Sequence, residues 1–438
     1  MRKLLLAVVT LLFLLALNAL AQDSATTVPE EGTPAPAAQP EPLRPLSGAL
    51  LQSSGKSGIP SGKLVPSLTF SETTTTLSGT TDYRANIVGD LAYDQLSPRH
   101  AFTLRYSGGG LFDVDNSDLN RTFQQLYLSE SFTVRRWNFL FGDALAYMPQ
   151  SPIGGGFGIP GLGQFTSDLS LTNLYPNLVP SQSILTLDTS ALNNSTFAQG
   201  QYNFTRQTSV TGVASYGLLR YPDESALDGH QMFFSTGLNH SIGRAQVALQ
   251  GSYSHFSYEA TNSGMESEML QLMYSRPLGH SFSMQIGAGP ESVHPLGSTA
   301  HNRLTESGLA ALSYRRKQDH VTLRYTRGAN GGSGLLMGVL ADNVQLSAGH
   351  QGRFWGISAT GGYARSSGII QSVTTSSNTA GAQVTRTFHR NMKVYFSYTY
   401  LTQDAGTLCV AGTCALNTHE HIFGIGFHWN PRGLRVGE

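Results

Sequence analysis

Apolar and polar residues alternate at every second position through most of this chain. In the last such stretch, residues 421–429, the apolar face holds Phe423, Ile425, Phe427 and Trp429, and the other face holds Gly424, Gly426 and His428. An apolar outer face, a small or polar inner face and an aromatic residue at the interface are typical of a strand in a transmembrane barrel.

The same two-residue period recurs upstream, at residues 394–400, 355–363, 321–326 and 247–253. Arginines help to assign the faces, because an arginine on the lipid face at mid-bilayer costs about 2–4 kcal/mol. Arg105 and Arg324 both fall on the polar face of their strands. We therefore expect both side chains to face the lumen.

Two kinds of connection separate these strands. The short ones lie at residues 97–99, 135–136, 206–207, 243–244, 277–279, 316–319, 351–353 and 389–391. The longer ones are rich in Gly, Ser, Asn and Asp, as at residues 109–118, 221–229, 261–265, 290–303, 328–334 and 365–377. Short turns that alternate with longer loops are typical of an outer-membrane barrel, with the short turns on the periplasmic side.

The turn pattern predicts an all-β fold, a transmembrane antiparallel β-barrel. Eight short turns require eighteen strands if both termini are periplasmic, with residues 68–77 as the first strand, paired with the last. The Thr-rich composition of that first strand makes sixteen strands the alternative. Either number gives a lumen wide enough for water.

The N-terminal part predicts export. Arg2 and Lys3 precede an apolar run at residues 4–17, and residues 19–21 form an A-x-A cleavage site, so residues 1–21 predict a signal peptide, with a retained membrane anchor as the alternative. Residues 22–63 are rich in Pro, Ala and Ser and predict a disordered periplasmic linker, either a spacer or a tether to a periplasmic partner. The barrel is then expected over residues 64–430, followed by a short tail at 431–438.

The composition supports the barrel. Charged residues make up 13% of the 438 residues, whereas soluble secreted proteins usually carry nearer a quarter. The formal net charge is zero, so nothing indicates a nucleic-acid partner.

One connection is much longer than the rest. It runs from Met148 to Asn193, opens with a Gly-rich run and carries Asp168 and Asp188 as its only charges. Loops of this length are normally functional or disordered, and in porin-like barrels they often fold into the pore. The candidate constriction residues are Phe157, Ile159, Phe165, Asp168 and Asp188. The alternative is an external flap.

The remaining candidate chemistry is sparse. Cys409 and Cys414, the only cysteines, lie close together in the last outer loop, and in an exported protein we expect them to form a disulfide. His419 and His421 share a strand face, but no third ligand accompanies them, so we expect no metal site. We identify no catalytic residues, no cofactor-binding motif and no enzyme signature.

Four segments carry a resemblance to bacterial outer-membrane β-barrels of the porin type, including uncharacterised barrels encoded beside exopolysaccharide genes. These segments are residues 68–76 (L-T-F-S-E-T-T-T-T), 119–132 (L-N-R-T-F-Q-Q-L-Y-L-S-E-S-F), 215–221 (S-Y-G-L-L-R-Y) and the last strand. The resemblance covers nearly all of the chain after the linker. One departure is that residues 430–438 follow Trp429, whereas many such barrels end on the aromatic residue that the assembly machinery recognises.

The first functional hypothesis is therefore a porin-like channel in the bacterial outer membrane, for passive or substrate-selective passage of small solutes. Polysaccharide export and a closed structural or adhesive barrel are the alternatives. The implied partners are outer-membrane lipids, the barrel assembly machinery, small polar solutes or glycans, and a periplasmic partner if the linker is a tether. The sequence leaves the oligomeric state open.

Overall fold

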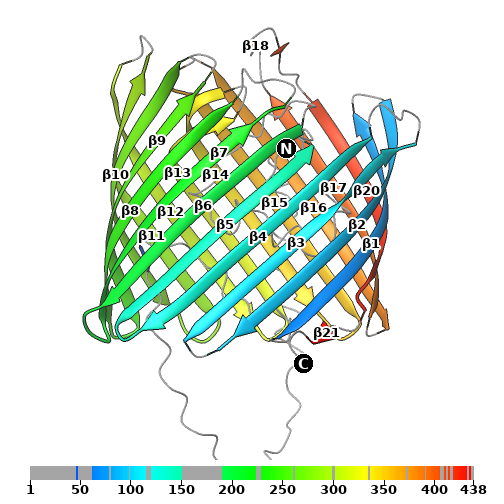
Figure 1. Cartoon of the computed structure of the whole chain (residues 1–438). Coiled ribbons are helices and arrows are strands. Elements are labelled where there is room, and N and C mark those ends of the chain that lie inside the picture. The colour runs from blue at the N-terminus through cyan, green and yellow to red at the C-terminus, as the bar shows by residue number, and fades with distance from the viewer. Residues whose placement is uncertain are drawn as a thin grey trace, which may run out of the picture. The chain divides into compact units, whose positions relative to one another are not determined.

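The computed structural model forms a closed antiparallel β-barrel (Figure 1). Its main sheet holds nineteen strands, of which the two-residue β21 only extends an edge, so the barrel wall has eighteen. The structure describes residues 46–47, 62–77, 80–97, 99–114, 120–149, 190–222, 228–259, 262–297, 301–333, 336–370, 373–389, 391–404, 409–410, 413–414, 418–431 and 434–435.

The first half of the wall is formed by β1 Lys63–Leu77, β2 Thr80–Leu96, β3 His100–Asp113, β4 Arg121–Val134, β5 Trp137–Pro149, β6 Ser190–Asn203, β7 Thr208–Arg220, β8 Gly229–Ile242 and β9 Ala245–Tyr258. The second half is formed by β10 Ser263–Pro277, β11 Phe282–Leu296, β12 Arg303–Arg316, β13 Asp319–Ser333, β14 Leu336–Gln351, β15 Trp355–Gly368, β16 Thr374–His389, β17 Met392–Asp404 and β20 Thr418–Trp429. Outside the wall lie β18 Cys409–Val410, β19 Thr413–Cys414 and β21 Leu434–Arg435.

The barrel closes between its first and last strands. β1 pairs with β20 from Leu68 opposite Trp429 to Leu77 opposite Glu420. The predicted eighteen strands and the predicted pairing of first with last are confirmed. After Trp429 the chain pairs with β1 again, through β21, so part of the predicted tail extends this seam.

The eight short turns lie where the sequence predicted them, and each joins two neighbouring strands of the wall. Tight two-residue connections between antiparallel strands require positive φ at a central residue. Arg135 and Gly243, each the first residue of such a turn, have φ of 54° and 60°. Each of the eight turns joins an even-numbered strand to the next odd-numbered strand of the antiparallel wall. All eight therefore lie at the same rim of the barrel, called here the short-turn rim.

At the opposite, long-loop rim, the strands run further than predicted. Residues 290–296, predicted as loop, belong to β11, and residues 328–333 belong to β13. The long connection is also shorter at both ends, because Met148 lies in β5 and Asn193 in β6. The prediction erred because main-chain hydrogen bonds between strands continue where apolar alternation has ended.

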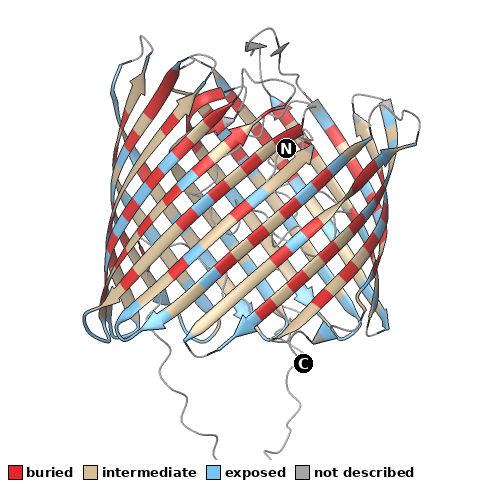
Figure 2. Cartoon of the chain, viewed as in Figure 1, coloured by how far each residue is buried: buried red, intermediate tan, exposed pale blue. Residues whose placement is uncertain are grey.

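The two faces of the wall differ in burial, which alternates along many of the strands, as in β4 and β8 (Figure 2). In β20, Phe423, Ile425 and Trp429 are exposed on the outer face, whereas His428 is buried on the inner face. The predicted assignment of faces in this strand is confirmed. Among the described residues, no helix is long and apolar enough to cross a bilayer.

Candidate functional site: the inner wall of the barrel

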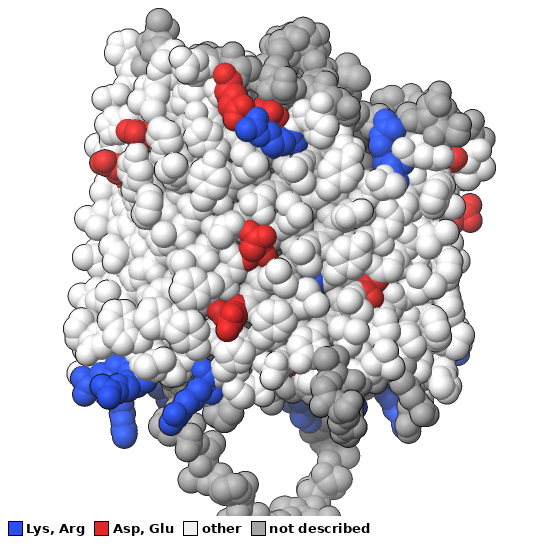
Figure 3. All heavy atoms as spheres, in the orientation of Figure 1, with Lys and Arg blue, Asp and Glu red and all other residues white. Residues whose placement is uncertain are grey.

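The outer wall is mostly apolar; its basic side chains lie mainly at the rims, whereas some acidic side chains also lie at mid-height (Figure 3). Basic side chains gather at the short-turn rim, where Arg353 lies over the ring of Phe354 at 5.0 Å, and Arg386 over Trp355 at 4.9 Å. Cationic and aromatic side chains at one level suit the headgroup region of a bilayer. The face opposite these apolar side chains is the one that can carry a function in water.

The tip of the β13–β14 hairpin, residues 329–332 and 336–341, folds inward against the barrel wall at the long-loop rim. It contacts strands that are not its neighbours in the sheet, because the Tyr258 hydroxyl on β9 donates to the carbonyl oxygen of Gly331 and accepts the N–H of Gly338 at 2.7 Å. Residues 336–341 are all buried. The hairpin tip thus occupies part of the lumen beside β9, β10 and β11.

A buried carboxylate fixes the other side of this hairpin tip. Glu291 on β11 is 3% exposed and accepts the Ser267 hydroxyl at 2.6 Å. It also accepts the backbone N–H of Ala329, with the two carboxylate oxygens 3.2 and 3.1 Å away. Below the tip, Ala329 packs on an apolar cluster of Phe256, Met265 and Val293.

The sequence pattern did not predict this element. It assigned residues 328–334 to a simple outer connection and placed the constriction in the connection between β5 and β6. A usable signal was present, since the apolar run Leu335-Leu336-Met337 follows a Gly-rich turn where a solvated loop would be polar. Phe157, Ile159, Phe165, Asp168 and Asp188 lie outside the described residues, so the predicted constriction there stays a prediction.

A second polar cluster lies on the inner wall of β1–β3. Arg105 is 9% exposed, and its Nη2 donates to Oδ2 of Asp94 at 2.7 Å. Nearby, Asp90 accepts hydroxyl hydrogen bonds from Ser67 at 2.9 Å and Ser107 at 2.6 Å. These buried charges are compensated by neighbours on the same face, as buried charges must be.

Further around the barrel, the inner wall of β13–β16 is more open. Arg324 on β13 alternates with the exposed outer-face residue Leu323 and stands opposite Gln345 on β14. Gln345, Thr360 and Gln383 are exposed. No carboxylate in the described part of the chain forms an ion pair with Arg324, in contrast to the Asp94–Arg105 pair.

The two cysteines lie opposite each other in the β18–β19 ladder, with Cys409 paired in register with Cys414. This backbone arrangement is compatible with the predicted disulfide, which stays a prediction. His421 lies on the outer face of β20, where its Nδ1 is 3.0 Å from the Tyr398 hydroxyl. Groups of three or more potential metal ligands are absent from the described residues.

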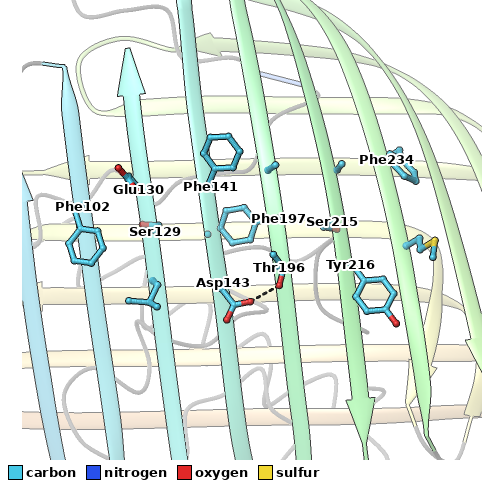
Figure 4. A pocket seen from close by; sticks show the side chains of 15 residues that line it. Phe102, Ser129, Glu130, Phe141, Asp143, Thr196, Phe197, Ser215, Tyr216 and Phe234 are labelled. Carbon is cyan, nitrogen blue, oxygen red and sulfur yellow. Dashed lines mark hydrogen bonds between the residues drawn. The ribbon is translucent and has the colours of Figure 1, made fainter. Parts of the chain in front are cut away.

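A groove of about 670 Å³ opens on the outer wall over β3–β8 (Figure 4). Aromatic side chains rim it, among them Phe141 and Tyr216, and its carboxylates are Glu130 and Asp143. Asp143 accepts the Thr196 hydroxyl at 2.5 Å. Because this groove faces away from the lumen, we do not assign it to the pore.

No protein-family model and no curated protein sequence match the chain. Solved structures similar to it include Pseudomonas aeruginosa OccK2 (OpdF) in complex with glucuronate, 13% identical with a TM-score of 0.43, covering 84% of this chain and 98% of that one. The outer-membrane protein OpdK of Pseudomonas aeruginosa is 8% identical with a TM-score of 0.44, with coverages of 84% and 98%. The siderophore receptor PiuA of Acinetobacter baumannii is 10% identical with a TM-score of 0.42, with coverages of 83% and 69%.

What these structures share with the chain is the barrel. At such identities and scores they carry no argument about its solute, and they do not support an association with exopolysaccharides. The residues of the inner wall are therefore the ones that indicate a function.

Proposed function

We propose that this chain is a channel of the bacterial outer membrane through which small polar solutes pass down their concentration gradient. The apolar outer wall, with its basic and aromatic short-turn rim, suits insertion in a bilayer with that rim toward the periplasm. The observation that carries the proposal is the open inner wall of β13–β16, where Arg324 stands opposite Gln345 and where Gln345, Thr360 and Gln383 are exposed. Exposed polar side chains inside a closed barrel support a water-filled path.

The charges support a preference for anionic over cationic solutes. Arg105 and Asp94 neutralise each other, whereas Arg324 has no such partner among the described residues. An uncompensated guanidinium in a confined aqueous path attracts carboxylates and repels cations. The acidic residues Asp168 and Asp188 of the β5–β6 connection would, in contrast, weakly favour cations or neutral solutes. We propose that Arg324 lines the path, and that the β13–β14 hairpin tip narrows it at the long-loop rim.

The test is a planar-bilayer measurement on refolded full-length protein, with a salt gradient for ion selectivity and glucuronate or glucose as added solutes. We expect discrete channels, anion selectivity, and a larger reduction of ion current by glucuronate than by glucose. Protein that folds and inserts but never conducts would support the closed-barrel alternative. Block only by long glycans would support polysaccharide export.

A further inference from the structure

Within the predicted linker, Leu46 and Ser47 contact the inner wall of the barrel. Asn239 on β8 accepts the backbone N–H groups of Leu46 and Ser47, each at 2.8 Å, through its Oδ1. The Nδ2 of the same side chain donates to the carbonyl oxygen of Ser47 at 3.1 Å. Thr211 on β7 donates its hydroxyl to that carbonyl oxygen at 2.5 Å. Ser47 is 1% exposed and Asn239 is fully buried.

This contact has the features of a peptide-binding site. A side-chain amide that pairs with both the N–H and the C=O of one residue recognises the peptide backbone rather than a particular side chain. The wall also leaves space for the backbone, because a Cβ added at Gly237 would lie 2.6 Å from the carbonyl carbon and oxygen of Ser47. Asn239, Thr211 and Gly237, defined here as the inner-wall seat, thus offer two donors, one acceptor and room for one bent segment.

The inner-wall seat lies on the lumen side of the wall, close to the short-turn rim. Asn239 is close to the end of β8 at Ile242, near the short-turn rim, and Gly237 and Asn239 lie on the face opposite the exposed residue Leu238. The next described residue after Ser47 is Gly62, whose N–H donates to the carbonyl oxygen of Asp94 on β2 at 2.7 Å. β2 and β8 are six strands apart around the wall. The two ends of this connection are therefore attached to distant parts of the barrel.

We propose that the inner-wall seat is a binding site for the backbone of a bent peptide segment, occupied in this protein by its own Leu46–Ser47 segment, and that this occupancy competes with solute passage. The proposal about passage rests on the proposed channel function. Occupancy of the seat does not, and the two parts have separate tests.

Occupancy is tested by cross-linking in full-length protein that carries Cys409→Ser and Cys414→Ser. Ser47→Cys with Thr211→Cys, which leaves the Asn239 amide in place, should form a disulfide under mild oxidation, detected by peptide mass mapping without reduction. The matched control is Ser47→Cys with Asn193→Cys, because Asn193 is an inner-wall asparagine of β6 near the other rim, and it should stay unlinked. Two free thiols in the first variant after oxidation, in protein that migrates as folded on unheated gels, would overturn the proposal.

Competition is tested by conductance. Asn239→Ala removes the amide, and Gly237→Val adds a side chain where Ser47 lies, so each should raise single-channel conductance, whereas Asn193→Ala should not. In protein lacking residues 22–61, a synthetic peptide of residues 43–50 (L-R-P-L-S-G-A-L) should restore block. The same deletion with Asn239→Ala should need at least roughly tenfold more peptide, since it loses several backbone hydrogen bonds. If the peptide fails to block channels that do conduct, competition is wrong even where cross-linking shows occupancy.

Discussion

The hydroxyl of Tyr258 joins two residues of a hairpin that begins four strands away along the barrel, accepting the N–H of Gly338 at 2.7 Å and donating to the carbonyl oxygen of Gly331. Gly338 has a φ of +60°, which a glycine adopts without strain, and its lack of a side chain lets it lie against Met265 and Ile370. This one side chain therefore satisfies two backbone groups of the β13–β14 hairpin tip and holds it in the lumen.

Replacing Tyr258 with Phe should loosen this tip. The substitution keeps the ring but leaves a buried N–H and a buried C=O without their partner, at a cost of about 1–3 kcal/mol for each unsatisfied group. We expect a higher mean single-channel conductance and more frequent current fluctuations in planar bilayers. Tyr253→Phe is the control, because Tyr253 lies on the same strand and its hydroxyl donates to Glu266 on the outer wall. Equal currents in the wild type and Tyr258→Phe would show that the tip does not limit flow.

Arg324 should set the ion selectivity. Arg324→Gln removes an uncompensated charge from the inner wall, and we expect the reversal potential in a salt gradient to shift toward cation selectivity. Arg327→Gln is the matched control on the same strand, since Arg327 pairs with Asp342 at 3.0 Å and lies on the outer face beside Tyr325. A shift of equal size in both variants would indicate a general effect of net charge and not a local one.

Breaking the Asp94–Arg105 pair should destabilise the barrel. The two side chains are 2% and 11% exposed, so Arg105→Met leaves a buried carboxylate without its guanidinium, which costs about 3–5 kcal/mol. Urea unfolding in lipid vesicles, followed by tryptophan fluorescence, would measure the loss. Adding Asp94→Asn should restore part of it, because the uncompensated charge is then removed. Arg353→Met at the exposed short-turn rim should have little effect, and a similar loss there would contradict the argument from burial.

Cys409 and Cys414 should form a disulfide on the cell exterior. Their backbones are paired in register, and a ring this small stabilises by roughly 2 kcal/mol on the chain-entropy model. A membrane-impermeant maleimide should label intact cells only after reduction. Labelling without reductant would show free thiols, and no labelling after reduction would show that the pair is not accessible.

Deleting residues 154–176 tests the constriction predicted between β5 and β6. Because the hydrogen bonds of the barrel run between strands, the deletion should leave heat-resistant migration on gels unchanged. We expect higher conductance than the wild type. Unchanged conductance and selectivity would return this connection to the external-flap hypothesis and leave the β13–β14 hairpin tip as the principal narrowing.

The sequence by itself determined the wall of the barrel. A strand with one face toward lipid and one toward the lumen must alternate at every second residue, so the faces of Ile425 and His428 follow from their neighbours along the chain. Tight turns such as Arg135–Arg136 can likewise be recognised from a few neighbouring residues. Strand number and closure followed from counting these local features.

Only the tertiary structure decided what the lumen contains. Tyr258 meets Gly338 across 80 residues of sequence, and Asn239 meets Ser47 across 192. Neither contact produces a periodic pattern in the sequence, because each depends on the curvature of a closed sheet that brings distant inner faces together. Strand ends at the long-loop rim were misplaced for a related reason, since main-chain pairing there is independent of side-chain pattern. The pattern of the chain therefore specifies the barrel, whereas contacts between distant segments specify which parts of its interior remain open.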